Sequence, residues 1–423
     1  MKKDNIKSVV VLFACCLVVA LLLAAVNLVT APIIEQNMQN AQFAALEGLV
    51  PNASYEEKTD LEGIPDSING IFLDKNGGGV AIIFSASSQY SSSPMQYAVG
   101  IDMDGKIIAI KEISYMESKD FGNYPETFVG KEYASIDSVE AFSGVTYSSN
   151  AFKSGLKDAF TAFYAATGGE LKETEIDILN KLVEGLSFTE IQTEAEFDSH
   201  ITAVYRADAL TYAFRYTEGE NVYLVVTDIF GNVLSSAVYE GAEGTTVPTD
   251  FVADAVKELV ATEIIGKVLD KTTEFEYVPT VIPPHTVIYE IAFTGKREFV
   301  ARTVANFRTA EGYVILVESQ GYAALNNGGE SIVLTVGFDK DGKITKTHVV
   351  SHAETSNIGG DKVIGNKDYT DKYIGLDDIP YSPNSFIDAD AYATYTYVAY
   401  HNGVRMAYLQ ISALLNKPGN ISK

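Results

Sequence analysis

The chain has 423 residues, of which 47% are hydrophobic and 21% charged. This composition is ordinary for a folded protein with room for two or three domains, so a disordered chain is not expected. The 31 basic and 56 acidic residues give a formal net charge of −25. Such a charge repels nucleic acid and anionic lipid, and it argues against a nucleic-acid-binding function.

Residues 8–34 form an uncharged, strongly apolar stretch. A helix needs about 20 such residues to cross a hydrocarbon core of about 30 Å, so the stretch predicts a transmembrane helix. Basic residues before a span favour a cytoplasmic N-terminus. We therefore expect residues 1–7 to be cytoplasmic and the bulk of the chain to be extracytoplasmic, anchored in the cell membrane by a single pass. The bases that set this orientation are Lys2, Lys3 and Lys7.

A cleaved signal peptide and a lipoprotein processed at Cys15 are the alternatives to a retained anchor. The apolar core of a signal peptide is only about 7–15 residues long, and bulky Phe13 suits lipoprotein processing poorly. Cys15 and Cys16 both lie inside the predicted span. The exported part therefore has no thiol or disulfide, and redox chemistry there needs a cofactor.

Three segments share one β-hairpin pattern with a tight Asp-x-x-Gly turn, in which glycine takes the positive φ that such turns require. A glutamate stands twelve residues after each turn glycine, so the carboxylate belongs to the repeat. The segments read MQYAVGIDMDGKIIAIKEISYMES, NVYLVVTDIFGNVLSSAVYEGAEG and SIVLTVGFDKDGKITKTHVVSHAET, and the glutamates are Glu117, Glu243 and Glu354.

A helix-like apolar stretch and a β-meander precede each hairpin. Helices are predicted after the first two hairpins, in SSNAFKSGLKDAFTAF and TDFVADAVKELV. The first has an apolar stripe for packing on a sheet, formed by Phe152, Leu156, Phe160 and Phe163. The alternating aromatic residues of TYTYVAYHNGV, at 394–404, are more typical of a strand core.

This order of elements predicts an α+β fold, with one N-terminal transmembrane helix followed by tandem modules with largely antiparallel sheets. No GxGxxG or GxxxxGK[ST] loop supports a site for NAD or ATP. The expected parts are a cytoplasmic tail (1–7), the transmembrane helix (8–34), a first module (35–170), a truncated degenerate repeat (171–262), a second complete module (263–415) and a tail (416–423).

The segment Glu140-Ala-Phe-Ser-Gly-Val-Thr146 directly precedes the striped helix. A helix N-terminus attracts anions such as phosphate, although small polar residues there are usually caps. The segment resembles the flavinylation motif of the FMN-binding domain family, D-x-x-[ST]-G-A-T-x-[ST], with Glu140 in place of Asp and Val145 in place of Ala. The resemblance implies that Thr146 carries FMN through a phosphoester, with Ser143 and Gly144 beside it.

A second family signature, roughly H-x-E-T-P-G-L-G, follows the hairpins. The last repeat resembles it through His352, Glu354, Thr355 and Gly359, and the first repeat keeps Glu117 and Gly122. Thr394 stands in the register of Thr146, but Ala391-Tyr392 replaces the Ser-Gly that precedes it. These residues form a candidate second flavin site in the last repeat. We expect no flavin site in the middle repeat.

The five histidines do not have the spacing of metal ligands, so no metal site is predicted.

The FMN-binding domain family includes the RnfG proteins of Rnf electron-transport complexes and the corresponding flavin-carrying component of the sodium-pumping NADH:quinone oxidoreductase. Asn27-Leu-Val-Thr-Ala-Pro-Ile-Ile34 resembles the end of the anchor in RnfG proteins.

The resemblance implies a membrane-anchored electron-transfer flavoprotein similar to RnfG, acting as one component of a complex rather than as an enzyme alone. Its partners would be integral-membrane electron-transport proteins of that complex and, for maturation, a flavin transferase. A stand-alone flavoprotein for extracellular electron transfer is one alternative, which the duplication favours. A non-redox acidic surface-binding protein that lost flavin in most repeats is the other.

Overall fold

The computed structural model describes residues 13, 16, 17, 19–21, 23, 24, 26–28, 30, 40–88, 93–116, 120–139, 141, 142, 145–242, 244–291, 294–327, 330–354, 359–385 and 393–416. The predicted transmembrane helix, residues 8–34, lies largely outside them. Within the described residues no helix is both long and apolar enough to cross a membrane. The chain forms two compact units, Met1–Lys172 and Glu173–Lys423.

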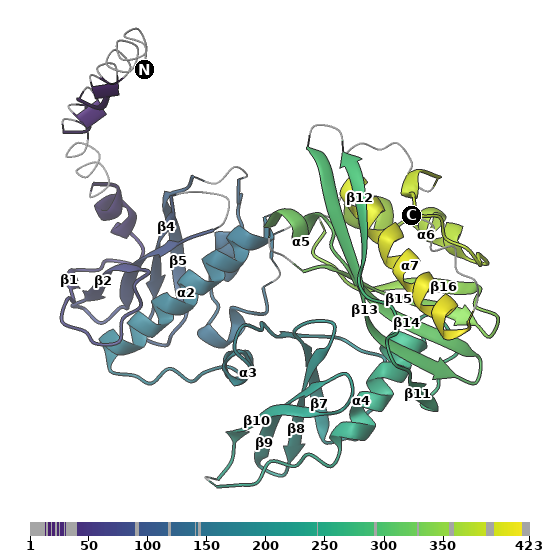
Figure 1. Cartoon of the computed structure of the whole chain (residues 1–423). Helices are drawn as coiled ribbons and strands as arrows, with labels where there is room; N and C mark the ends of the chain where they lie inside the picture. The colour runs from purple at the N-terminus through teal and green to yellow at the C-terminus, as the bar shows by residue number, and fades with distance from the viewer. Residues whose placement is uncertain are drawn as a thin grey trace. The chain divides into compact units, whose positions relative to one another are not determined.

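Three antiparallel meanders form the three sheets, and they confirm the predicted mixture of helices with antiparallel sheets (Figure 1). The first sheet has the order β1-β2-β3-β4-β5 and the second β10-β9-β8-β7-β6. Their strands are β1 (Tyr55–Glu57), β2 (Ile68–Asp74), β3 (Val80–Ala86), β4 (Met95–Ile101), β5 (Ile107–Ser114), β6 (Thr189–Glu190), β7 (Ile201–Arg206), β8 (Thr211–Glu218), β9 (Asn221–Asp228) and β10 (Val233–Glu240).

The third sheet repeats the meander as β11-β13-β14-β15-β16, and a sixth strand, β12, pairs with the long β13. Its strands are β11 (Phe275–Tyr277), β12 (His285–Ile291), β13 (Gly295–Thr309), β14 (Gly312–Ser319), β15 (Ile332–Asp339) and β16 (Ile344–Ser351). The last hairpin of each sheet is therefore the repeated hairpin of the sequence.

The helices are α2 (Thr146–Thr167), α3 (Glu175–Leu182), α4 (Val252–Val260), α5 (Tyr322–Asn327), α6 (Lys367–Thr370) and α7 (Thr394–Leu414). Residues 40–46 are also helical. Short 3₁₀ and π turns are η1 (Pro125–Phe128), η2 (Tyr133–Ser135), η3 (Ala261–Ile265), η4 (Gly360–Ile364), η5 (Asp371–Tyr373) and η6 (Pro383–Ser385).

The three hairpin turns have the same geometry. In each, the first aspartate accepts backbone N–H bonds through Oδ1 from the residues two and four positions later, at 2.8–3.0 Å. The turn glycines have φ of +81°, +85° and +77°, the left-handed region that glycine adopts without cost. These hydrogen bonds explain the aspartates as turn residues. They are Asp102, Asp228 and Asp339, with Gly105, Gly231 and Gly342.

Each sheet buries both of its faces, one against an earlier helical segment and one against a later helix. In the first sheet Ile82 and Phe84 pack with α2, whereas Ala81 and Ile83 pack with Leu46 and its neighbours on the other face. Successive strand residues point to opposite faces, so strands buried on both sides become almost continuously apolar. The predicted stripe of α2 is confirmed, because its four residues are at most 2% exposed.

One continuous helix serves two repeats. α4 runs directly into the π-helical turn η3, and the junction residue Ala261 keeps helical angles of φ −60° and ψ −37°. Val256 of α4 lies in one core cluster with Phe214 of the second sheet and Phe307 of the third, and η3 contacts β14 and β15. The middle repeat and the third repeat therefore share a core and form one unit.

The segment 394–404, for which the aromatic alternation favoured a strand, is the start of helix α7. That expectation was wrong because α7 is buried on nearly all sides, from Tyr395 through Ser412. A helix without a polar face has no 3.6-residue pattern to reveal it. Figure 1 shows α7 lying along the third sheet, as α2 lies along the first.

A glycine near the middle of each long helix permits this close packing. A Cβ on Gly155 of α2 would stand 2.5 Å from Cδ2 of Phe84, and one on Gly403 of α7 would stand 2.5 Å from Cδ2 of Leu334. Phe84 is held between the rings of Tyr97 and Phe152, at 6.0 and 5.8 Å, so it has little room to move.

We expect Gly155→Ala to destabilise the first unit, although alanine is the better helix former. Overpacking costs about 1–3 kcal/mol, and the better helix propensity of alanine offsets about 1 kcal/mol of this, so we expect a net loss of up to about 2 kcal/mol in the free energy of unfolding. Urea unfolding of this variant and of Ser154→Ala, its exposed neighbour, measures the difference. Equal stabilities of the two variants would contradict the packing argument.

Candidate flavin site

Helix α2 begins at Thr146, so the threonine of the motif occupies the first helical position. The preceding residue, Val145, has φ −138° and ψ 38°, makes no side-chain cap, and is followed by a first turn without acidic residues. The first N–H groups of a helix lack partners within the helix and carry partial positive charge. This end of α2 therefore suits a phosphate group.

The turn before α2 is fixed by Ser149, a fully buried residue that the sequence patterns did not single out. Its Oγ accepts the N–H of Phe142 at 3.0 Å and donates to the carbonyl of Val145 at 2.9 Å. The N–H of Val145 in turn donates to the carbonyl of Phe142 at 3.1 Å. Ser149 thus holds two backbone positions of the motif, Phe142 and Val145, against the helix.

An aromatic cluster supports this turn from inside the first unit. Phe152 of α2 lies 5.8 Å from Phe121, 6.1 Å from Tyr124 and 4.8 Å from Tyr97, measured between ring centroids. Phe142 lies 6.0 Å from Tyr124 and is 39% exposed, so the cluster reaches solvent within the motif. Burial raises the pKa of Tyr124 to about 12, against an opposing effect of the Ser149 hydroxyl. Tyr124 therefore stays protonated at neutral pH.

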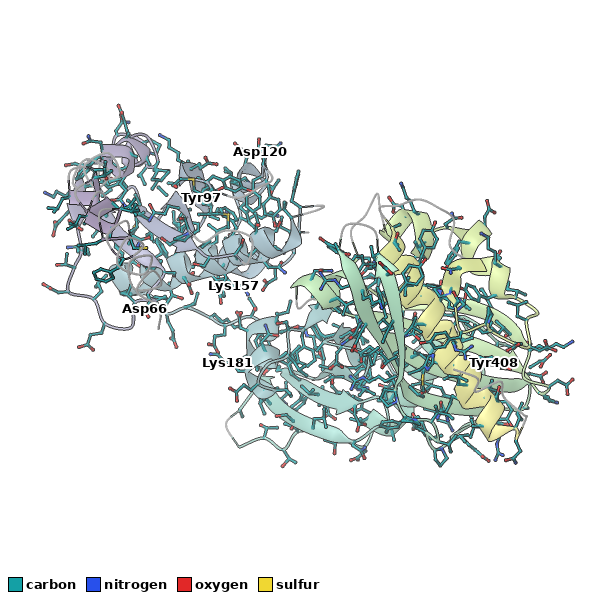
Figure 2. The ribbon with its side chains drawn as sticks, turned by 45° about the horizontal axis from the view of Figure 1, so that its top comes forward. Asp66, Tyr97, Asp120, Lys157, Lys181 and Tyr408 are labelled. Carbon is teal, nitrogen blue, oxygen red and sulfur yellow. The ribbon has the colours of Figure 1, made fainter. Side chains whose placement is uncertain are left out.

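Acidic groups adjoin this cluster. Glu112 pairs across the strands with Tyr97, and burial, together with the nearby charge of Asp120, raises the pKa of its carboxyl. Tyr97 lies in the interior of the unit and Asp120 towards its edge (Figure 2). Oδ1 of Asp120 accepts the N–H of Gly122 at 2.9 Å. Gly122 has φ +53°, so this position of the signature loop favours glycine for its backbone angles.

Several residues of the predicted sites lie outside the described part of the chain. In the first repeat, Val145 and Gly122 are site residues that the structure does describe. Val145 is 5% exposed. In the first repeat the undescribed residues are Glu117, Glu140, Ser143 and Gly144, and in the other repeats they are Glu243 and Thr355.

In the third repeat Thr394 begins α7 after Ala393, as Thr146 begins α2. The repeat carboxylate Glu354 is 5% exposed. Its Oε1 accepts the N–H of Ala323 at 3.0 Å, and its Oε2 accepts a hydrogen bond from the hydroxyl of Thr396, two residues into α7. The structure thus brings Glu354 to the start of the helix, across 42 residues of sequence from Thr396.

Two glycines make room for this contact. A Cβ on Gly321 would stand 2.4 Å from Oε1 of Glu354, and one on Gly359 would stand 2.1 Å from Oγ1 of Thr396. Gly359 has φ −70°, so close packing explains this glycine, whereas backbone conformation explains Gly122. The same signature position therefore meets different physical demands in the two repeats.

His352 also lies beside Glu354. Its Nδ1 accepts the N–H of Glu354 at 3.2 Å, which requires that nitrogen to be unprotonated. Burial lowers the pKa of His352, against the opposing charges of Glu354, Glu330 and Asp361. Among the described residues no group of three or more His, Cys, Asp or Glu side chains could hold a metal ion.

Comparison with known families gives two matches. Residues 90–161 and 328–409 each match the FMN-binding domain, and residues 1–49 match the RnfG N-terminal region. No curated protein matches the chain. The chain therefore contains duplicated FMN-binding modules and resembles RnfG, which confirms the resemblance drawn from the motifs. The matches indicate a flavin-binding electron-transfer protein.

Proposed function

We propose that the chain is an electron-transfer flavoprotein, anchored by its N-terminal segment, that carries FMN through a phosphoester on Thr146. The observation that carries the proposal is the position of Thr146, the first residue of α2 inside a matched FMN-binding domain. The bond would join Oγ1 of Thr146 to the phosphorus of FMN, with the net loss of one water. Bound FMN supplies one- and two-electron transfer chemistry.

The residues of the first repeat fit this group. The N–H groups of the first turn of α2, to which Val145 provides no side-chain cap, would stabilise the phosphate, and Ser149 fixes the approach to Thr146. Ser143 and Gly144 would give a modifying enzyme access to the threonine, because glycine brings no side chain. Covalent attachment would keep the cofactor on a protein exposed outside the membrane, where lost FMN is not readily replaced.

The third repeat fits a flavin less well. Ala391 and Tyr392 stand in the sequence where the first repeat has Ser143 and Gly144, so the motif of the third repeat lacks the glycine before its threonine. We therefore propose one flavin, at Thr146. The proposed partners are the integral-membrane proteins of an Rnf-like complex and a flavin transferase for maturation, supported by the RnfG-like N-terminal region.

Co-expression of the full chain with a flavin transferase tests the redox function. The denatured protein should run as a fluorescent band on a gel, and the folded protein should bleach reversibly at the flavin absorption when dithionite and then air are added. A colourless, unmodified band under these conditions would contradict the proposal and leave the non-redox binding protein as the better account.

A further inference from the structure

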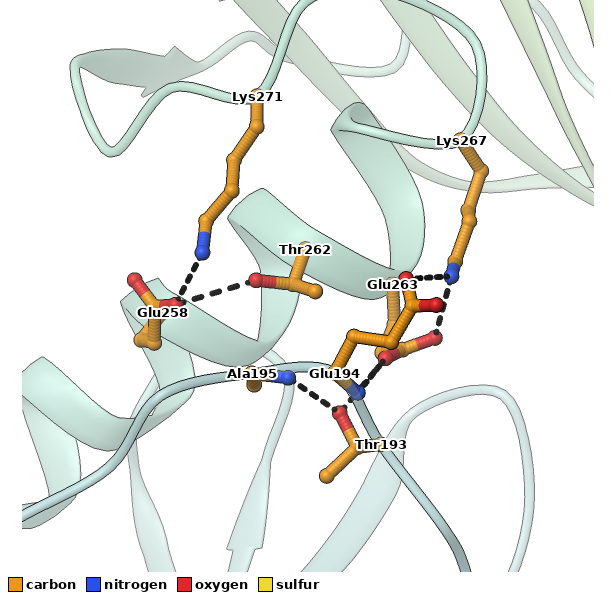
Figure 3. Close-up of polar contacts among 8 residues, drawn as sticks. All are labelled: Thr193, Glu194, Ala195, Glu258, Thr262, Glu263, Lys267 and Lys271. Carbon is orange, nitrogen blue, oxygen red and sulfur yellow. Dashed lines mark hydrogen bonds and ion pairs between the residues drawn. The ribbon is translucent and has the colours of Figure 1, made fainter.

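Two polar networks of the second unit differ in kind. The first consists of ion pairs and fastens residues 193–195 to the helix formed by α4 and η3 (Figure 3). Its carboxylates are paired with lysines, Glu258 with Lys271 and Glu263 with Lys267, so the stability of the unit explains them. The second network consists of uncharged tyrosine and histidine side chains in the core of the third repeat, and it needs a different account.

The second network is a directed chain of hydrogen bonds that ends on His401 of α7. Burial lowers the pKa of His401 to about 4, so its ring is neutral at neutral pH. Its Nε2 lies 2.9 Å from the carbonyl of Pro380, which can only accept, so Nε2 carries the hydrogen and Nδ1 is an acceptor. The hydroxyl of Tyr373, 3.1 Å from Nδ1, is therefore the donor. The hydroxyl of Tyr369, 3.1 Å from that of Tyr373, must then donate to the Tyr373 oxygen.

This chain lies inside the protein. Tyr373 and His401 are fully buried, and Tyr369 is 2% exposed. Burial raises the pKa of Tyr373 well above its ordinary value, so the hydroxyl keeps its proton at neutral pH. Loss of an electron from such a phenol would leave a buried positive charge, which is costly unless the proton leaves with the electron. The proton cannot reach water directly, and Nδ1 of His401 is the acceptor that the geometry provides.

Four tyrosine rings pack together around this chain. The ring centroid of Tyr373 lies 5.9 Å from that of Tyr369 and 5.8 Å from that of Tyr400, and Tyr397 lies 4.7 Å from Tyr369. The protein has no tryptophan, and both of its cysteines lie in the apolar N-terminal stretch. Tyrosine is therefore the most readily oxidised aromatic side chain of the protein. Packed rings allow an electron to pass between them and shield a radical from solvent.

The histidine of this network is specific to the third repeat. Counted from the threonine that begins each long helix, Phe152 and Lys153 of α2 stand where α7 has Tyr400 and His401. The first repeat packs its helix on the same kind of sheet without a histidine at this position. Folding of the module therefore does not require the pair of Tyr373 and His401.

We propose that Tyr373 is a one-electron redox site with His401 as its proton acceptor. When a diffusible inorganic radical takes one electron from the phenol, the O–H bond of Tyr373 breaks and an N–H bond forms at Nδ1 of His401. The products are a neutral tyrosyl radical, an imidazolium and the anion of the oxidant. The hydrogen bond from Tyr369 then stabilises the radical oxygen. This activity is separate from flavin binding at Thr146.

Pulse radiolysis of the purified full chain without flavin tests this site, with azide present so that azidyl radicals are the oxidant. The protein should form a tyrosyl radical that outlasts the radical of free tyrosine, measured by its optical absorption and, after freezing, by electron paramagnetic resonance. Tyr373→Phe should remove this long-lived signal because the phenol is absent. His401→Gln should also remove it, because glutamine can accept the hydrogen bond but not the proton.

Tyr400→Phe is the matched control, since Tyr400 is buried in the same ring cluster but its hydroxyl donates to Oγ1 of Thr347 at 2.7 Å instead of to a base. It should keep the long-lived signal. Tyr369→Phe should keep the radical but change its g values, because the radical oxygen loses a hydrogen bond, and it remains informative if Tyr373→Phe fails to fold. The proposal would be overturned by the absence of a long-lived radical in the unmodified chain, by an undiminished signal in folded Tyr373→Phe, or by unchanged g values in Tyr369→Phe. Because no flavin is present, none of these results bears on Thr146.

Discussion

Replacement of Thr146 by alanine should abolish covalent flavin, with the in-gel fluorescence of the band falling to background. Alanine lacks the hydroxyl that the phosphoester requires, and it is a good helix former, so α2 should remain intact. The measurement is fluorescence of the denatured protein after co-expression with a flavin transferase. Circular dichroism of the same sample checks that the variant folds.

Two matched variants make this result specific. Thr146→Ser retains a hydroxyl at the start of α2 and should keep some covalent flavin, whereas Thr394→Ala should leave the fluorescence unchanged. Fluorescence that survives Thr146→Ala but disappears in Thr394→Ala would move the cofactor to the third repeat. That outcome would mean that Tyr392 does not obstruct the modifying enzyme.

The second large effect concerns acid and the buried residue His401 of α7. Its Nε2 lies 2.9 Å from the carbonyl of Pro380, which can only accept, so this nitrogen carries the hydrogen. Nδ1 then accepts from the hydroxyl of Tyr373 at 3.1 Å. Burial lowers the pKa of His401 to about 4, and the charges of Arg405 and His285 add to this, against the opposing hydrogen bond to Pro380.

The lowered pKa of His401 predicts a loss of stability on acidification. The unfolded chain takes up a proton near pH 6.5, but the folded chain does not until about pH 4. Stability from this group is therefore present above pH 6.5 and lost as the pH falls towards 4, by up to about 3 kcal/mol.

Urea unfolding at pH 7.5 and pH 4.5 measures this effect. His401→Gln, which can keep one donor and one acceptor, should be less stable at pH 7.5 but lose about 2–3 kcal/mol less on acidification than the unmodified chain. Equal pH dependence of the two proteins would show that His401 does not govern acid stability.

The repeated hairpins were predictable because local chemistry determines them. The turn at Asp339, for example, is closed by hydrogen bonds from residues two and four positions away, and Gly342 is required by its own φ. The existence of α2 was predictable for the same reason, since a small polar segment precedes an amphipathic stripe, although the helix begins at Thr146 itself and not just after it. Such patterns involve only residues close together in the chain, so they can be recognised in the sequence itself.

Contacts between distant segments were not predictable in this way. Glu354 was recognised as part of the repeat, but its bond to Thr396 depends on how α7 lies across the sheet. Gly155 and Gly403 are spaced like ordinary helix residues, and only the close approach of Phe84 and Leu334 explains them. Aligning the two helices would have revealed the shared glycine, because both stand nine residues after the threonine of their repeat.

The sequence likewise did not reveal that two repeats share one helix. The sequence patterns gave α4 and the apolar stretch after it as separate features of successive repeats, and nothing local distinguishes a break from a π-helical turn at Ala261. A pocket lined by Arg206, Tyr212 and His348 lies at that junction, and its walls come from strands more than a hundred residues apart in sequence. Sequence spacing alone could not bring these side chains together.

The most direct test of the flavoprotein account is the mass of the proteolytic peptide that contains Thr146, taken from the full chain after co-expression with a flavin transferase. We predict that this peptide is heavier by the mass of FMN minus one water, and that fragmentation places the addition on Thr146. An unmodified peptide from a preparation whose transferase demonstrably modifies another substrate would contradict the account.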